Sequence, residues 1–307
     1  MPDISYILPV YNKAEALPFF LKSLRDQQGD FTAEYIFIDD VSTDHSKAVL
    51  REIMGDCANF HLIENTINAG PAIRLNQGAQ IARGKYLALF DCDEILAPNA
   101  VSTLLALARN HHADMVHGKW RKTTNSIDRV TAETIPPTAP NRVFDDPLAR
   151  VLGRGMVRMT WLVEHTLFLR AGGCDEQVFV QDESFRLRLA AKAKRLVDSE
   201  AIITMVPDVG SHVSSNNLQL HHDRFFIFYN FLTAHPDLPP PTRRKLVEKC
   251  ISAARKARRD GAKFPLMPVM FHYLRAKVGL APLTPDSLAG LRDQFLGLDS
   301  VRRPSRP

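Results

Sequence analysis

Two aspartates separated by a single residue, Asp91 and Asp93, form the pattern in this sequence best suited to chemistry. They follow the apolar run 87–90, which predicts a buried strand that ends at the first carboxylate. In an extended chain, residues i and i+2 project to the same side, so both carboxylates would face one crevice and Cys92 would point away. Carboxylate oxygens are the ligands that hard divalent cations prefer. We therefore predict that Asp91 and Asp93 can share one divalent cation, and a solvated turn is the alternative.

The segments before this pattern alternate between strand-like and helix-like patterns. Residues 4–10, 35–38 and 60–63 are short apolar runs, and each is followed by a segment whose apolar residues have helical spacing. This alternation predicts an α/β fold with a mostly parallel central sheet flanked by helices. In such sheets, ligands bind beyond the carboxyl ends of the strands.

Polar residues follow three of the predicted strands. Tyr11 follows the first strand, Asp39 and Asp40 end the second, and Asp91 and Asp93 follow the fourth. The carboxyl ends of parallel strands meet at one edge of a sheet, so we expect all five residues to lie on one rim of the protein.

The composition is that of a soluble globular protein. The chain has 307 residues, of which 45% are hydrophobic and 24% are charged. No apolar run approaches the roughly 20 residues needed to span a bilayer, and the N-terminus lacks a secretory signal pattern. The predicted location is therefore cytoplasmic, with peripheral contact at the inner face of the membrane as a further possibility to test.

Cysteines and paired histidines offer few further metal ligands. The four cysteines are scattered without Cys-x-x-Cys spacing, so neither a disulfide framework nor a zinc site is expected. Neighbouring residues on a helix point about 100° apart, so the pairs at 111–112 and 221–222 are expected to be ordinary surface or interface histidines.

Positive charge is concentrated at the C-terminal end. Residues 241–307 contain 15 Lys/Arg and 5 Asp/Glu, whereas the first 240 residues contain 24 and 29. The imbalance predicts an acidic partner or surface for this region, and no nucleic acid is expected. The stretch 264–283 mixes apolar residues with Arg275 and Lys277, so it could lie on an anionic membrane surface. A helical lid and an oligomer contact are the alternatives.

Six segments occur in an order that resembles a known family; they are 7–12, 38–44, 68–76, 84–93, 172–176 and 181–183. Together they resemble the inverting glycosyltransferases of family 2, which have the GT-A fold. The resemblance covers about the first 215 residues. It implies a GT-A domain at 1–215 and leaves 216–307 as a helical, basic C-terminal extension.

The resemblance implies a nucleotide-sugar donor, specifically a UDP-sugar. Asp40 matches the residue that accepts a hydrogen bond from the uracil ring, with Asp39 beside it. The backbone at Pro9, Val10 and Tyr11 would form a wall on the other side of the base. A turn that these acids only cap and solvate is the alternative.

The resemblance also implies how the diphosphate is bound. Asp91 and Asp93 would hold Mn²⁺ or Mg²⁺ on the two phosphates, and Arg74 would lie near the diphosphate oxygens. The alternative for Arg74 is a charge on the surface of a helix. His212 lies where relatives carry a residue that reaches the metal or the phosphate.

Inversion requires a base that takes the proton of the acceptor hydroxyl group. The resemblance implies that Asp182 is this base. Gln181 departs from the acid that is commoner at that position, so Glu183 is a lesser candidate. An acid in a first helical turn also stabilises the helix, which gives Asp182 a purely structural alternative.

These residues predict an enzyme that transfers a sugar from a UDP-sugar to a carbohydrate or lipid-linked acceptor. The product would belong to a surface polysaccharide such as a capsule, an exopolysaccharide or a lipopolysaccharide. A nucleotidyltransferase is an alternative, although residues 9–12 lack the glycine-rich loop expected after its first strand. A glycosyltransferase-like binding subunit without catalysis is another.

Overall fold

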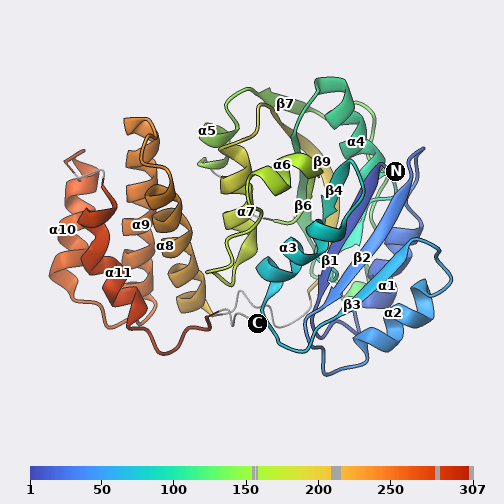
Figure 1. Ribbon diagram of the computed structural model, residues 1–307, viewed down its shortest axis with the longest axis horizontal. Helices are drawn as coiled ribbons and strands as arrows, with labels where there is room; N and C mark the ends of the chain where they lie inside the picture. Colours follow the sequence, from blue (N-terminus) through green and yellow to red (C-terminus); the bar gives the residue numbers. More distant parts are fainter. Residues whose placement is uncertain (154–155, 157, 209–215, 281–283, 304–307) are drawn as a thin grey trace. The chain divides into compact units, whose positions relative to one another are not determined.

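The computed structural model describes residues 1–153, 156, 158–208, 216–280 and 284–303 (Figure 1). The described residues of Met1–Cys174 and Arg188–Gly210 form one compact unit, and those of Asp175–Leu187 and Ser211–Pro304 form another. We call them the sheet unit and the helical unit. The helical unit thus includes a short segment from the middle of the chain, while the domain boundary expected at residue 215 stays a prediction.

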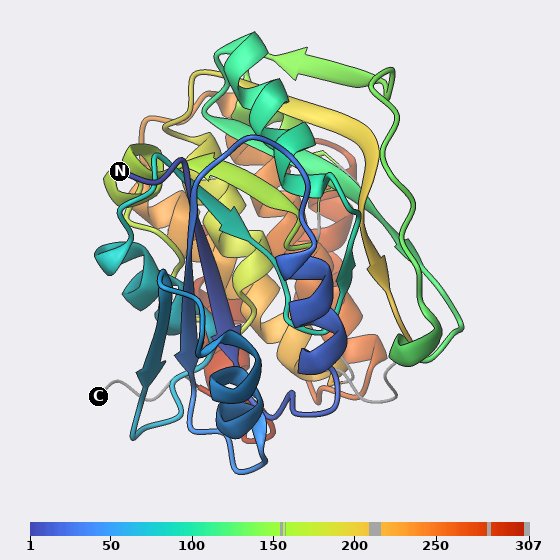
Figure 2. The same ribbon diagram turned by 90° about the vertical axis from the view of Figure 1, so that its right-hand side faces the viewer.

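The described part of the sheet unit contains a nine-stranded sheet. Its strands are β1 (Ile4–Val10), β2 (Ala33–Asp39), β3 (Phe60–Glu64), β4 (Tyr86–Leu89), β5 (Ile95–Leu96), β6 (Met115–Lys122), β7 (Asn141–Phe144), β8 (Trp161–Glu164) and β9 (Leu196–Val206). The order is β3-β2-β1-β4-β8-β6-β9-β5, with β7 also paired to β9. The first four strands in this order run parallel, β8 is antiparallel to both neighbours, and β6 is parallel to β9 (Figures 1 and 2).

Helices connect and cover these strands. The sheet unit contains α1 (Leu17–Arg25), α2 (Ser46–Met54), α3 (Pro71–Ile81), α4 (Ala100–His111), α5 (Pro147–Val151) and α6 (His165–Arg170). Helix α7 (Gln181–Ala190) begins in the helical unit, which also contains α8 (Asn217–Ala234), α9 (Pro240–Arg259), α10 (Leu266–Lys277) and α11 (Ala289–Leu296). None of the described helices is long and apolar enough to cross a membrane.

Helices cover both faces of the sheet. Successive residues of a strand point to opposite faces, and in β1 both faces carry apolar residues. Tyr6 and Leu8 of β1 belong to a core cluster that also contains Phe20 of α1. Ile7 points to the other face, where α3 packs. A side chain at Gly78 of α3 would place its Cβ 2.6 Å from Cγ2 of Ile7, so glycine permits this close approach.

The strand register aligns the carboxyl ends of β1, β2 and β4. Val10 pairs with Asp39, and Ile7 pairs with Leu89, so these strands finish at the same edge of the sheet. We call this edge the rim. The α/β fold and the shared rim are confirmed. The sheet is less parallel than expected, because the pairs that β8, β5 and β7 form are antiparallel.

Helices of the helical unit pack around an aromatic cluster. The ring of Phe295 in α11 lies 4.6 Å from that of Phe225 in α8 and 4.8 Å from that of Phe264, between ring centroids. His221 and His222 of α8 are both buried. The surface position that we expected for them is therefore wrong. One ring nitrogen of each pairs with a carboxylate: Nε2 of His221 with Asp260 at 2.9 Å, and Nδ1 of His222 with Asp223 at 2.8 Å.

Candidate active site

Asp39 shapes the turn that follows β2. Its buried carboxylate accepts hydrogen bonds from the backbone N–H groups of Val41 and Ser42, both at 3.1 Å. Val41 has a φ of 68°, which a β-branched residue adopts only with strain of about 1–3 kcal/mol. The capping role considered for Asp39 is therefore present, and the turn is held by these bonds.

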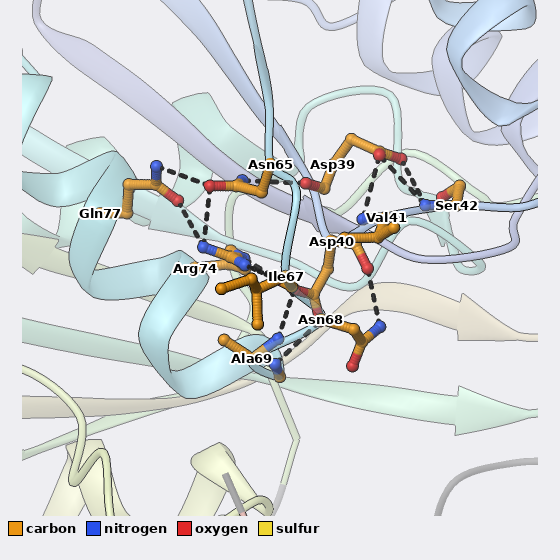
Figure 3. A network of polar contacts seen from close by, with 11 residues as sticks. Asp39, Asp40, Val41, Ser42, Asn65, Ile67, Asn68, Ala69, Arg74 and Gln77 are labelled. Carbon is orange, nitrogen blue, oxygen red and sulfur yellow. Dashed lines mark hydrogen bonds and ion pairs between the residues drawn. The ribbon is translucent and has the colours of Figure 1, made fainter. Parts of the chain in front are cut away.

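Asp40 joins the end of β2 to the beginning of α3. Its carboxylate accepts hydrogen bonds from the backbone N–H groups of Ala69 and Gly70, each at 2.8 Å, and from Nε of Arg74 at 2.7 Å (Figure 3). The Asp40 and Arg74 side chains are 5% and 6% exposed. A carboxylate is favoured here because the N–H groups at a helix N-terminus carry partial positive charge.

Arg74 also organises the loop at 65–70. Its Nη1 donates to Asn65 Oδ1 at 2.9 Å and to Gln77 Oε1 at 3.1 Å, and its Nη2 donates to the carbonyl oxygen of Ile67 (Figure 3). Arg74 is buried, so the alternative of a surface helix charge is wrong. Its diphosphate-binding role stays a prediction, and that role would require Arg74 to exchange partners.

The loop after β1 is fastened to the loop after β2. Asn12 has a φ of 51°, a conformation that asparagine tolerates better than most residues. Its backbone N–H donates to Ser42 Oγ at 3.0 Å, and its side-chain oxygen accepts from the Thr43 N–H at 2.8 Å. The backbone N–H of Lys13 donates to Ser46 Oγ at 2.8 Å. These bonds fix where the Lys13 side chain begins.

The predicted base-binding wall differs in exposure along its length. Val10 is buried and Pro9 is half-buried, whereas the Tyr11 side chain is 42% exposed. An exposed aromatic ring on the rim is available for stacking, while Pro9 and Val10 would contribute backbone. Their nucleotide-binding role stays a prediction.

Asp91 and Asp93 lie in a turn beyond β4. The strand ends at Leu89, so the expected extended geometry is wrong, because residues 92 and 93 belong to a turn. Cys92 is buried and both aspartates are half-buried, so Cys92 points away from the surface as expected, while the shared crevice of the two carboxylates stays a prediction. The Cys92 thiol lies 3.6 Å from the Pro9 carbonyl oxygen, which places this turn beside the end of β1.

Lys13 contacts this acidic turn, which the sequence did not indicate. Its ammonium group forms an ion pair with the Asp93 carboxylate. Burial lowers the pKa of Lys13, but the carboxylates of Asp93 and Asp91 outweigh that effect and raise it above its ordinary value. Lys13 is thus a charged partner of the predicted metal ligands.

The donor set fits a cation that is shared with a phosphate ligand. In the part of the chain that the structure describes, no group of three or more His, Cys, Asp or Glu residues could hold a metal. Asp91 and Asp93 would supply two carboxylates, and Mg²⁺ sites commonly combine so few protein ligands with phosphate oxygens and water. His212, the third predicted ligand, lies outside the described residues.

Glu94 adds a buried acid behind this turn. One carboxylate oxygen accepts from Arg158 at 3.1 Å, and the other is buried without a hydrogen-bond partner. Burial, followed by the charge of Asp91, raises the pKa of Glu94 to about 8. Sequence reasoning missed Glu94, although its position beside the two aspartates was a usable indication.

Asp182 and Glu183 begin α7 and have different surroundings within the helical unit. Glu183 accepts from Arg224 at 3.1 Å and pairs with Arg186 at 3.3 Å. One oxygen of Asp182 is buried and has no hydrogen-bond partner. Burial, followed by the charge of Glu183, raises the pKa of Asp182 to about 6. Asp182 thus combines a raised pKa with an oxygen that has no partner, and both features suit a proton acceptor.

Comparisons with known proteins bear on the family of this chain. A family model described as Glycosyl transferase family 2 matches residues 5–157, the stretch that contains the rim. The chain belongs to this family. The poly(ribitol-phosphate) β-glucosyltransferase of Bacillus spizizenii is 27% identical over 164 residues, which are 48% of this chain and 26% of that relative. The matches span between 26% and 48% of the length of the first curated relatives.

Solved structures show which fold the family member adopts. Staphylococcus aureus TarS 1-349 in complex with UDP-GlcNAc is similar with a TM-score of 0.69 at 20% identity, covering 95% of this chain and 89% of that one. A mannosyltransferase from Pyrobaculum calidifontis in complex with GDP-Man and Mn²⁺ is similar with a TM-score of 0.58 at 17% identity, covering 96% and 85%. The predicted GT-A fold is confirmed.

Proposed function

We propose that this chain is a metal-dependent, inverting glycosyltransferase that moves a sugar from a UDP-sugar to a carbohydrate or lipid-linked acceptor of a surface polysaccharide. The observation that carries the proposal is the acidic turn on the rim, where Asp91 and Asp93 lie beside the end of β1 and Lys13 pairs with Asp93. The names of the relatives support the class: one is a glucosyltransferase acting on poly(ribitol-phosphate), and TarS binds UDP-GlcNAc.

The donor would bind along the rim. Tyr11 would stack on the uracil, and the turn built by Asp39 and Asp40 would border it. A cation held by Asp91 and Asp93 would neutralise charge on the departing diphosphate. The mannosyltransferase neighbour, which binds GDP-Man and Mn²⁺, supports the inclusion of a metal.

Transfer would proceed by a single displacement at the donor carbon C1. The acceptor oxygen forms a bond to C1 while the bond from C1 to the phosphate oxygen breaks, and the diphosphate leaves with the electron pair. The acceptor hydroxyl proton passes to the Asp182 carboxylate. A pKa of about 6 leaves this carboxylate mostly ionised near neutral pH and basic enough to accept a proton.

Thermal unfolding of the purified chain with nucleotide-sugars tests the donor site. A ligand at about 100 times its Kd stabilises a protein by about 2.7 kcal/mol, so binding of a UDP-sugar should raise the Tm by several degrees. We expect this shift with Mn²⁺ or Mg²⁺ and a much smaller one with EDTA. Asp91→Asn and Asp93→Asn should remove the metal-dependent part.

Asp26→Asn is a suitable control, because Asp26 is exposed at the C-terminal end of α1 and pairs with Lys22 one helical turn away. Equal shifts with metal and with EDTA would rule out the metal role. A metal-dependent shift without any sugar transfer to acceptors would favour the binding-subunit alternative.

A further inference from the structure

One face of α10 in the helical unit exposes a row of apolar side chains. Their spacing of four, three and four residues follows the helical repeat, so they form a single stripe. The stripe consists of Met267, Phe271, Leu274 and Val278, which are 77%, 55%, 57% and 68% exposed, and it continues into Leu280 at 67%. Single exposed apolar residues are ordinary, whereas a continuous row indicates a contact surface.

The opposite face of α10 is packed. Val269 is buried, and the ring of Tyr273, one turn further on, lies 4.5 Å from the Arg255 guanidinium of α9. Helix α10 therefore already has a partner within its own unit, and the stripe is the side that faces away from it. The exposed row is not needed to hold α10 on α9.

Basic residues lie beside the stripe. Residues 240–277, which span α9 and α10, contain 11 Lys/Arg and 2 Asp/Glu. The Arg275 guanidinium lies 5.1 Å from the ring centre of Phe271. Nη1 of Arg244 in α9 lies 3.8 Å from the position that a Cβ on Gly279 would take, so this cation lies next to the end of the stripe. Flexible basic side chains next to apolar ones suit an interface where acyl chains meet headgroups.

We propose that the stripe docks on an anionic lipid surface, with its apolar side chains inserted and the neighbouring arginines among the headgroups. A second copy of this chain is a poorer occupant, because apposing two such faces would bring like charges together. Anionic headgroups would neutralise those charges instead. The proposal is independent of sugar transfer, since the stripe contains none of the residues that we assign to donor binding or proton transfer.

Co-sedimentation of the full chain with phosphatidylcholine vesicles, with and without phosphatidylglycerol, tests the proposal. We expect binding to the vesicles that contain phosphatidylglycerol, and weaker binding at high salt because ions screen the attraction. The triple variant Met267→Ser, Phe271→Ser, Leu274→Ser should lose at least about tenfold in affinity, because three apolar anchors no longer leave water.

A matched control replaces three apolar residues that are exposed elsewhere. Phe19→Ser, Ile81→Ser and Leu296→Ser remove side chains that are 36%, 48% and 49% exposed. This triple control should bind vesicles like the parent. Arg244→Gln is a second, milder test, and it should weaken binding only to anionic vesicles.

Three outcomes would overturn the proposal. The parent chain could ignore anionic vesicles, or the stripe variant could bind them as tightly as the parent. Light scattering could instead show a dimer that the stripe variant dissociates, which would make a second copy the occupant. Donor binding measured on the same samples keeps this result separate from the donor site, because the stripe variant should bind nucleotide-sugar like the parent.

Discussion

Replacing Asp40 by asparagine tests whether one buried ion pair holds the rim together. The carboxylate accepts hydrogen bonds from two backbone N–H groups and from Arg74. Asparagine has a single acceptor oxygen, and its NH₂ group would face at least one of those donors. The substitution therefore leaves a buried guanidinium without its counter-charge and a buried N–H group without an acceptor.

The expected loss of stability is large. Removing one partner of a buried ion pair costs about 3–5 kcal/mol, because the remaining charge is left uncompensated. In a domain of roughly 200 residues, each kcal/mol lowers the Tm by about 2–4 °C. The sheet unit of Asp40→Asn should therefore melt roughly 6–20 °C below the parent.

Thermal unfolding followed by circular dichroism measures this difference, with Asp26→Asn as the matched control. Asp26 is 57% exposed in an i,i+4 pair with Lys22, and such pairs are worth about 0.3–0.5 kcal/mol. The control should thus melt close to the parent. If Asp40→Asn also melts within about 2 °C of the parent, the pair is not the brace described above and the reasoning is refuted.

Two further predictions concern catalysis and metal binding. Asp182→Asn should leave donor binding intact and lower the rate of sugar transfer by about 10²–10⁴-fold. In the parent, the transfer rate should rise with pH through about 6, because only the ionised carboxylate accepts a proton. A transfer rate that is already flat from pH 5 upward would contradict the raised pKa of Asp182. Lys13→Met should bind Mn²⁺ several-fold more tightly by calorimetry, because Asp93 loses its competing cation. Lys22→Met is the control, and equal affinity in Lys13→Met and the parent would exclude competition.

The fold followed from patterns that lie within short stretches of sequence. Apolar runs such as 35–38 alternate with amphipathic helices, and this alternation leaves few arrangements besides a parallel sheet with helices on both faces. The position of Asp39, Asp40, Asp91 and Asp93 at strand ends followed from the same argument. The turn at residues 92–93 did not, because a short apolar run does not show where its last hydrogen bond forms.

Long-range pairing was beyond sequence reasoning. Asp40 and Arg74 are separated by 34 residues, and Lys13 and Asp93 by 80. Nothing in the local pattern shows which base will meet which acid, because each pair depends on loop conformations. Lys13 was visible only as part of a polar turn, and Arg74 was assigned to the diphosphate when its observed partner is Asp40.

These two pairs have a consequence for donor binding. Arg74 pairs with Asp40, and Lys13 pairs with Asp93. The chain itself therefore neutralises two of the acids that we expect to bind the nucleotide and the metal. A divalent cation that binds Asp93 must displace the Lys13 ammonium group, which costs the free energy of that pair. A diphosphate arriving with the cation offers the released ammonium new anionic oxygens, which offsets the cost. Metal and diphosphate should therefore bind cooperatively, each with a lower Kd in the presence of the other, and Lys13→Met should weaken that coupling.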